Sequence, residues 1–224
     1  MMVLTGVKKT YPLSQGRLSA LQQTDLSVKA GEFIVIVGRS GAGKSTLLGI
    51  AGGLLHPTVG DVQLNSQSLW TIDDRTRARI RAEQIGFVFQ NASVISSLTL
   101  LENVMLASVF AQVPAETAQR RARLLLTDVG LGDRAGAYPD QISGGEKRRV
   151  AVASALINAP ALVLADEPTG ELDPDTEVRI MALLQQAHEQ GTTILLVTHN
   201  HDLIRYAQRA FIMEQGRLIE QEQS

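Results

Sequence analysis

The chain has 224 residues, of which 44% are hydrophobic, and this is enough for one sizeable α/β domain with a buried core. The formal net charge of −2 gives no electrostatic case for a nucleic-acid partner, and the absence of cysteine excludes disulfides and thiolate metal sites. No stretch approaches about 18 uninterrupted apolar residues, and the N-terminus lacks the apolar core of a signal peptide. We therefore expect a protein of the reducing cytosol that reaches a membrane only through another chain.

From the N-terminus to Gln90 the sequence predicts mainly strands, with one glycine-rich loop that leads into a helix. The elements expected in this part are, in chain order, two strands joined by an extended loop at 13–21, a strand at 32–37, a strand at 60–64, a short basic helix at 76–83 and a buried strand at 85–89.

Residues 91–159 are predicted to be helical, and the chain then returns to alternating strands and helices. The expected elements are helices at 98–110, 114–126 and 143–160, a strand at 162–166, a helix at 174–189, a strand at 192–197, a short helix at 202–208 and a hairpin at 211–219 that turns at Gln215 and Gly216. This order predicts a single α/β domain, 1–224, with a core of 1–90 and 160–224 and an inserted helical subdomain at 91–159.

The glycine-rich loop, residues 38–46, has the pattern of a phosphate-binding loop. Gly38, Gly41 and Gly43 let the backbone approach phosphates and turn its N–H groups inward, because no Cβ blocks the path. Lys44 can reach the β- and γ-phosphates of a nucleoside triphosphate, and the Ser45 hydroxyl can bind Mg²⁺. A plain glycine-rich turn with a surface lysine is the alternative, and the strand before the loop and the helix after it argue against that.

Two carboxylates, Asp166 and Glu167, end the apolar strand at 162–166. In a fold with a phosphate-binding loop this is where carboxylates face the metal, so we expect Asp166 to hold Mg²⁺ through water. Glu167 projects differently from the strand end and is expected to accept a proton from an attacking water. Taken alone, the pair would equally fit two solvated charges at the end of a strand.

A second anion-binding pattern, Gln-Ile-Ser-Gly-Gly-Glu-Lys at 141–147, precedes a predicted helix. It resembles the LSGGQ signature of the ATP-binding-cassette (ABC) ATPases, with Ile142 for the first Leu and Glu146 for the last Gln. The resemblance implies a P-loop NTPase fold of the ABC type and a head-to-tail homodimer, in which Ser143 and Gly145 of one subunit close on the γ-phosphate held by Lys44 of the other. In isolation, the same three residues would also fit a simple helix cap.

The resemblance covers essentially the whole chain and implies ATP and Mg²⁺ as ligands and ATP hydrolysis as the activity. Catalytic roles are implied for Glu167, for His199 as the switch histidine, for Lys44 and for Gln90, and Mg²⁺ ligands for Ser45, Gln90 and Asp166. The residues implied to contact nucleotide are Tyr11, which would stack on adenine, Gly38, Arg39, Ser40, Gly41, Ala42, Gly43, Lys44, Ser45, Thr46, Ser143, Gly144, Gly145, Glu146 and the D-loop residue Asp173. Taken alone, Tyr11 would fit packing, His199 would fit an ordinary strand-end histidine, and Arg39 would better fit a solvated loop arginine.

Within the family, the motifs are similar to those of the lipoprotein-release and macrolide-efflux ATPases (LolD/MacB type). Two positions depart from the family pattern: Ser154 stands where the family often has arginine, and Glu171 stands where alanine or asparagine is commoner in the D-loop. The resemblance implies a transmembrane permease as partner, a groove for one of its helices at 91–106, and a place on the cytoplasmic face of a bacterial inner membrane. Some apolar residues of that stretch would equally fill the helical core.

Three alternatives remain for the biological role. The first is an FtsE-like ATPase that transmits force across the membrane without moving a solute. The second is a soluble DNA-repair or chromosome ATPase, which would carry long coiled coils or zinc modules between the two motifs, and this chain has neither. The third is a ribosome-associated regulator, which usually carries two cassettes where 224 residues leave room for one.

Overall fold

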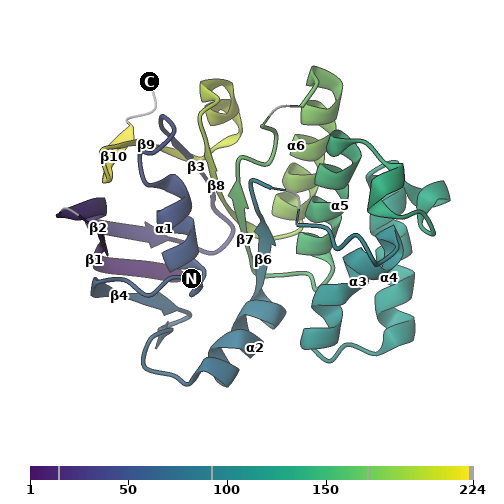
Figure 1. The fold of residues 1–224 in the computed structure, drawn as a ribbon, viewed down its shortest axis with the longest axis horizontal. Coiled ribbons are helices and arrows are strands. Elements are labelled where there is room, and N and C mark those ends of the chain that lie inside the picture. Colours follow the sequence, from purple (N-terminus) through teal and green to yellow (C-terminus); the bar gives the residue numbers. More distant parts are fainter. Residues whose placement is uncertain (15, 92, 171, 222–224) are drawn as a thin grey trace. The chain divides into compact units, whose positions relative to one another are not determined.

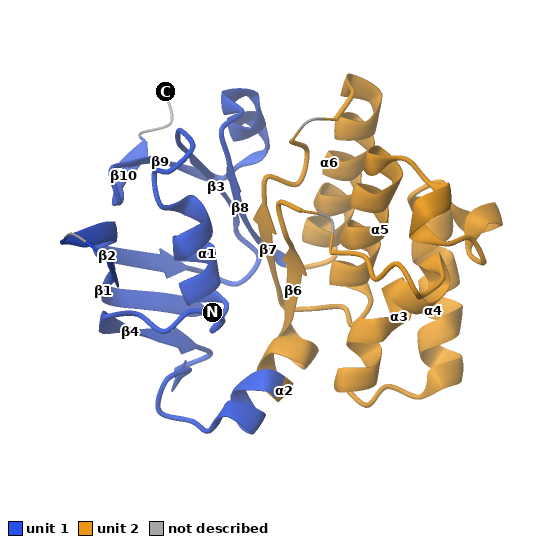
Figure 2. Ribbon diagram, in the orientation of Figure 1, with its two compact units in different colours: residues 1–78, 193–224 blue, residues 79–192 orange. Residues whose placement is uncertain are grey.

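The computed structural model of the protein describes residues 1–14, 16–91, 93–170 and 172–221. The chain forms two compact units, one of residues 1–78 and 193–224 and the other of residues 79–192 (Figure 2). Figure 1 gives the labels of the helices and strands. The helical subdomain at 91–159 stays a prediction.

The first unit contains an antiparallel sheet with the strand order β2-β1-β4-β5. Its strands are β1 (Met2–Pro12), β2 (Arg17–Val28), β4 (Val59–Leu64) and β5 (Gln67–Ser68). The prediction of an extended loop at 13–21 is wrong. Strand β2 already begins at Arg17, which pairs with Pro12 in the β1–β2 hairpin, and Leu18 pairs with Tyr11. The sequence gives a weak signal here since this end of β2 is exposed, with Leu18 52% accessible, and carries no buried apolar alternation.

A second group of strands in the same unit is built around β3 (Phe33–Val37). This strand pairs in parallel with both β8 (Thr193–Thr198) and β9 (Arg209–Glu214), and β9 pairs antiparallel with β10 (Arg217–Gln221). Every residue of β3 and of β8 is buried, which explains why both read as continuous apolar runs. Helix α1 (Lys44–Ala51) follows β3 and contacts β8, β1 and β2. A 3-10 helix at His201–Tyr206 stands where a short helix is predicted.

The second unit contains the parallel pair β6 (Ile85–Val88) and β7 (Leu162–Asp166) with a set of packed helices. Helix α3 contacts α4 and α5, and α5 contacts β6 and α6. The helices are α3 (Leu100–Phe110), α4 (Ala115–Asp128), α5 (Gly144–Leu156) and α6 (Pro174–Glu189), with 3-10 turns at Gly132–Arg134 and Pro139–Gln141. Helix α2 (Asp74–Gln84) has residues in both units.

Three of these helices begin at a side-chain cap that the sequence encodes. Thr99, Ser143 and Asp173 each accept a hydrogen bond from the backbone N–H three residues further on. Such caps satisfy N–H groups that have no partner inside the helix, and therefore fix where each helix starts. Among the described residues, no helix is long and apolar enough to cross a membrane.

Candidate functional site

The first residue of the phosphate-binding loop (38–46) lies beside His199 at one edge of the parallel strands. Val37 of β3 is paired with Thr198 of β8, and the N–H of Gly38 donates to the carbonyl of Thr198 over 3.0 Å. Carboxyl ends of parallel strands meet at one edge of a sheet, so the loop and His199 leave the strands together. His199 is exposed at this edge.

Glycine is required in the loop for two different reasons. Gly41 and Gly43 have φ values of +79° and +107°, which side chains rarely adopt. A Cβ on Gly43 would lie 2.3 Å from the carbonyl oxygen of Ala20, and one on Gly38 would lie 2.4 Å from that of Met213. By contrast, no atom lies within 4 Å of a Cβ built on Gly41, so the loop is packed at its ends and open at Gly41.

Lys44 begins helix α1 and is only 7% exposed. Its Nζ donates hydrogen bonds to the carbonyl oxygens of Gly38 at 2.7 Å and Arg39 at 3.2 Å, so the ammonium points back into the loop. The N-cap of the helix is Gly43, which has no side chain to occupy the first N–H groups. Backbone N–H groups at such a helix start, together with the ammonium, suit a phosphate.

The second unit aligns Gln90, Asp166 and Glu167 at the corresponding edge of β6 and β7. Val88 is paired in parallel with Ala165, so Gln90 follows β6 by two residues, Asp166 is the last residue of β7 and Glu167 comes directly after it. Glu167 is 6% exposed, and its φ of +48° is unusual for a residue with a side chain. Its carbonyl accepts from the N–H of Gly170 at 3.1 Å, which closes a turn. Strained backbone of this kind costs about 1 kcal/mol or more and is concentrated at functional sites.

Ser143 and Glu146 form a capping box at the start of α5. The Ser143 hydroxyl accepts from the N–H of Glu146 at 3.2 Å, and the Glu146 carboxylate accepts from the N–H of Ser143 at 2.8 Å. The backbone hydrogen bond from Ser143, assisted by the charges of Arg134 and Arg149, lowers the pKa of Glu146. The glutamate at the position of the signature's glutamine therefore fixes the conformation of Ser143, and this role was not predicted.

The signature lies next to the predicted D-loop inside the same unit. A Cβ built on Gly145 would lie 3.5 Å from Leu172 and 3.7 Å from Thr176, whereas nothing lies within 4 Å of one on Gly144. Asp173 caps α6 and accepts from the N–H and hydroxyl of Thr176 at 2.9 and 2.7 Å, which lowers its pKa. Glu171, the predicted D-loop departure, lies outside the described residues.

Three side chains bond to backbone groups near the site in contacts that no sequence pattern predicts. The Asn103 side chain is 6% exposed and makes four hydrogen bonds with backbone of residues 95–99, as acceptor from the Ile95 N–H and as donor to three carbonyls. Ser154 donates to the Asn103 carbonyl at 3.2 Å, and Arg148 of α5 donates to the Phe89 carbonyl at 2.9 Å, directly before Gln90. An asparagine or arginine inside a helical pattern carries no periodic signal that would announce such a contact.

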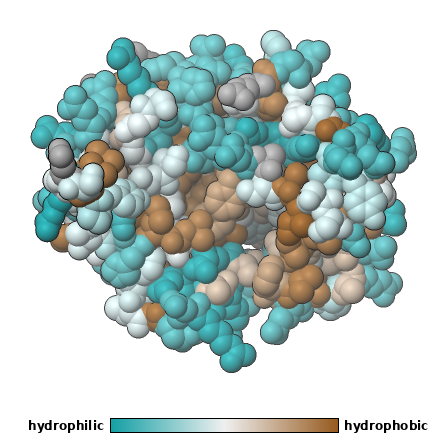
Figure 3. Space-filling view, in the orientation of Figure 1, coloured by the Kyte–Doolittle hydropathy of each residue, from teal (hydrophilic) through white to brown (hydrophobic). Residues whose placement is uncertain are grey.

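The predicted partner groove, 91–106, contains both core and surface residues. Leu100 is fully buried, which agrees with the alternative that apolar residues of this stretch fill the helical core. Ile95, by contrast, is 43% exposed. Phe89, just before the stretch, is also 43% exposed and its ring stacks on that of Phe87. The face drawn in Figure 3 is mostly hydrophilic and gathers its hydrophobic side chains in a few patches.

Tyr11 lies at the end of β1, half-buried, with the Nζ of Lys9 5.1 Å from its ring centroid. A cation over one face of the ring is compatible with a stacking role for the other face. The other histidines, read as surface residues from the sequence, are His56 and His201, which are exposed, and His188, which is half-buried.

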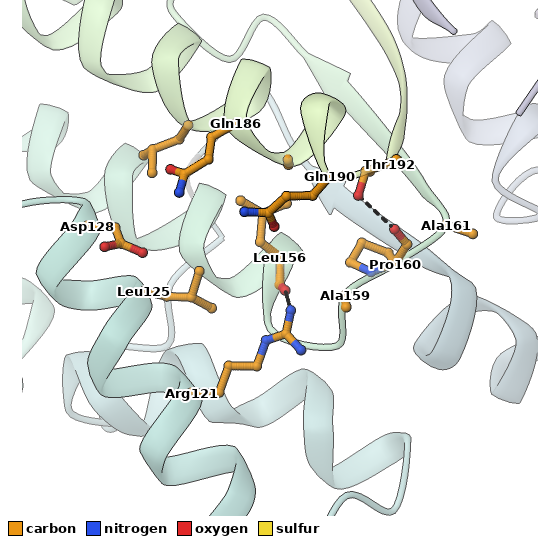
Figure 4. A pocket seen from close by; sticks show the side chains of 13 residues that line it. Arg121, Leu125, Asp128, Leu156, Ala159, Pro160, Ala161, Gln186, Gln190 and Thr192 are labelled. Atoms are coloured by element: carbon orange, nitrogen blue, oxygen red, sulfur yellow. Dashed lines mark hydrogen bonds between the residues drawn. The ribbon is translucent and has the colours of Figure 1, made fainter. Parts of the chain in front are cut away.

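A cavity of about 290 Å³ in the second unit contains none of the predicted site residues (Figure 4). Its walls come from α4, from the end of α5 with the loop after it, and from the end of α6. The Arg121 guanidinium, whose pKa is lowered by burial, donates to the Leu156 carbonyl at 3.3 Å, and Thr192 donates to the Pro160 carbonyl at 3.2 Å. The first contact caps the end of α5, and the second joins the loops that follow α5 and α6.

The predicted residues are divided between the two units. Tyr11, the phosphate-binding loop and His199 belong to residues 1–78 and 193–224. Gln90, the signature, the Asp166–Glu167 pair and Asp173 belong to residues 79–192.

Comparisons with known proteins match almost the whole chain. The family model for ABC transporters matches residues 21–170. The chain is 42% identical to the lipoprotein-releasing system ATP-binding protein LolD of Maricaulis maris, over 96% of this chain and 94% of LolD. It is 38% identical to the macrolide export ATP-binding/permease protein MacB 1 of Yersinia pestis, over 96% of this chain and 33% of MacB 1. A dimeric, post-hydrolysis structure of the ATP-binding cassette MJ0796 with ADP and Pi superposes with a TM-score of 0.94 at 39% identity, covering 99% of this chain and 98% of that one.

Proposed function

This chain belongs to the ABC transporter family, as an ATP-hydrolysing cassette of the LolD and MacB type, and we propose that two copies of it close head to tail around two ATP molecules. The family and the ABC-type α/β fold expected from the sequence are both confirmed. The activity is that of an ATPase, which releases ADP and phosphate. The individual residue roles below are proposals.

The observation that carries the proposal is the geometry of Lys44. Its buried ammonium points into a loop whose ends are packed and whose middle is open at Gly41. We assign the β- and γ-phosphates of ATP to this loop, held by Lys44 and by N–H groups of 38–46, with Arg39, Ser40, Ala42 and Thr46 as neighbours of the phosphates. Tyr11 would stack on adenine.

The predicted Mg²⁺ ligands, Ser45, Gln90 and Asp166, all provide oxygen atoms. Ser45 is exposed in the first turn of α1, Gln90 comes two residues after β6, and Asp166 is the last residue of β7. Mg²⁺ is commonly held by one or two carboxylates together with substrate phosphates and water, so these residues are donors of the right chemistry for it. When bound, Mg²⁺ would neutralise charge on the phosphate oxygens.

Hydrolysis needs a base, a sensor and the second subunit. Glu167, buried and fixed by its turn, would accept a proton from the attacking water, and His199 would hydrogen-bond the γ-phosphate. Ser143 and Gly145 of the other copy would contribute the hydroxyl and N–H groups that stabilise the developing charge, with Asp173 near the opposing loop. Each site is then complete only in the dimer.

We assign the 91–106 segment to a membrane-embedded partner and place the cassette on the cytoplasmic face of the membrane. The exposed Ile95 and the ordered backbone around Asn103 support a docking surface. MacB 1 is an ATP-binding/permease protein, and this chain covers 33% of it, so a permease would complete the same kind of assembly here.

The test is phosphate release from MgATP by the purified protein, together with ATP binding by equilibrium dialysis. The wild type should bind and hydrolyse ATP, and Lys44→Ala should lose at least about tenfold in affinity, since it removes charge-assisted hydrogen bonds to phosphate. Lys29→Ala, an exposed lysine between β2 and β3, is the control for a lost lysine. Equal ATP binding by Lys44→Ala and wild type would exclude the assigned site.

A further inference from the structure

The turn between β9 and β10 packs directly on the phosphate-binding loop, although the two are more than 170 residues apart in sequence. The N–H of Gly216 in this turn donates to the carbonyl of Ala42 over 2.9 Å. The chain just before the turn is also close, because a Cβ built on Gly38 would lie 2.4 Å from the carbonyl oxygen of Met213. The terminal hairpin therefore contacts the loop near both of its ends.

Gln22 of β2 holds this turn in place from the other side. Its N–H donates to the Gly216 carbonyl at 2.8 Å, and its side-chain Nε2 donates to the Gln215 carbonyl at 3.0 Å. Its Oε1 accepts from the Nε of Arg217 at 2.8 Å. One glutamine thus bonds to three successive residues of the turn, and we call Gln22, Gln215, Gly216 and Arg217 the Gln22 clamp.

The clamp leaves almost no room at its centre. Gly216 is buried and has a φ of +76°, and a Cβ on it would lie 3.0 Å from the Ala20 carbonyl and 3.1 Å from the Gln22 nitrogen. The same Ala20 carbonyl lies 2.3 Å from a Cβ built on Gly43 of the loop. Ala20 is therefore the shared surface against which both the turn and the loop are packed, and a shift of one would displace the other.

We propose that the Gln22 clamp is a positioning device for the phosphate-binding loop, and that it sets the affinity for the nucleotide phosphates without taking part in hydrolysis. The inference rests on the assignment of ATP to this loop. Hydrogen bonds run from Gln22 through Gly216 to Ala42, and Ala42 lies directly before Gly43 and Lys44. Because the N–H groups of the loop must converge on the phosphates, a small displacement at Ala42 weakens binding of nucleotide.

The experiment measures the ATP dissociation constant by equilibrium dialysis and kcat at saturating MgATP for Gln22→Ala. This change removes two hydrogen bonds and leaves the backbone bond to Gly216, so we expect the dissociation constant to rise about three- to tenfold with kcat within about twofold of wild type. The matched control is Gln23→Ala, the exposed neighbour on the opposite face of the strand, which should change neither quantity. Arg217→Ala should give a smaller rise, and Arg217→Lys, which keeps a donor, should restore affinity.

The Gln22 clamp and the assignment of the ATP site are tested by different variants. Equal ATP affinities for Gln22→Ala and Gln23→Ala would overturn the clamp, and so would a loss of kcat at unchanged affinity, which is the result expected of general destabilisation. If Gln22→Ala fails to fold, the comparison of Arg217→Ala with Arg217→Lys decides the question in the same way. Unchanged binding in Lys44→Ala would instead overturn the site itself.

Discussion

The carbonyl of Thr198 accepts a 3.0 Å hydrogen bond from the N–H of Gly38, and this bond fixes His199 relative to the start of the phosphate-binding loop. Because β3 and β8 are paired in parallel up to Val37 and Thr198, the strand residue directly before His199 has little freedom. A histidine held at this position can report on the terminal phosphate, since neutral imidazole offers both a donor and an acceptor.

His199→Ala should therefore keep ATP affinity within about threefold and lose about 100-fold in kcat, as expected when a group acting on the reacting phosphate is removed. The measurement pairs steady-state phosphate release with equilibrium ATP binding. His201→Ala, an exposed histidine two residues further on, is the control and should retain full activity. A His199→Ala enzyme with wild-type turnover would remove the residue from the mechanism.

Glu167→Gln should separate ATP binding from hydrolysis. The buried side chain stays the same size and the backbone turn to Gly170 is unaffected, so the fold and ATP affinity should be retained. Loss of the base should lower kcat about 100-fold or more, and ATP should then hold the two subunits together. Light scattering with and without MgATP measures the dimer, and Glu189→Gln, on the surface of α6, is the control. Normal hydrolysis by Glu167→Gln would contradict its assigned role.

Much of this fold could be predicted because its signals are local. The expected helix at 174–189 coincides with α6, where Asp173 provides the cap and Gly191 follows the end. The apolar runs of β3 and β7 correctly predict buried parallel strands. The hairpin turn lies at Gln215 and Gly216, as the glycine predicts. Each of these elements depends mainly on residues within a few positions along the chain.

What could not be predicted depends on contacts between distant segments. The pairing of Leu18 with Tyr11 extends β2 into residues that were expected to form a loop. This end of β2 is stabilised by its partner strand β1, and its own residue pattern does not indicate a strand. The role of Gln22 is set by a turn more than 190 residues away. The positive φ of Glu167 likewise follows from the tertiary environment, since glutamate has no intrinsic preference for that conformation.

Asn103→Ala should destabilise the predicted docking segment. The side chain satisfies backbone groups of Ile95, Leu98 and Thr99 in a buried setting, and its removal leaves them without these partners. We expect a loss of about 2–4 kcal/mol in the free energy of unfolding, measured by chemical denaturation. Asn91→Ala, an exposed asparagine, is the control and should change it by less than about 0.5 kcal/mol. Equal stability of the two variants would show that the segment does not depend on Asn103.

Glu146→Gln should make the stability of the protein less dependent on pH in the acidic range. The pKa of Glu146 is lowered from its ordinary 4.5, chiefly by the hydrogen bond from the Ser143 N–H, so the ionised carboxylate stabilises the folded state. This contribution is fully present above the unfolded-state pKa and is lost as the pH falls through the lower folded-state pKa. At pH 7 the variant should be less stable by about 0.5–1 kcal/mol, the usual worth of a capping contact.

The test is a series of chemical unfolding measurements from pH 7 down to the acid limit of the fold. The difference between wild type and Glu146→Gln should be flat above 4.5, the ordinary pKa of the carboxyl, and shrink below it. Glu83→Gln, an exposed carboxylate on α2, is the control and should change the free energy of unfolding at pH 7 by less than about 0.5 kcal/mol. A difference that stays constant as the pH falls would mean that packing of the side chain, and not its charge on the Ser143 N–H, stabilises the start of the signature helix.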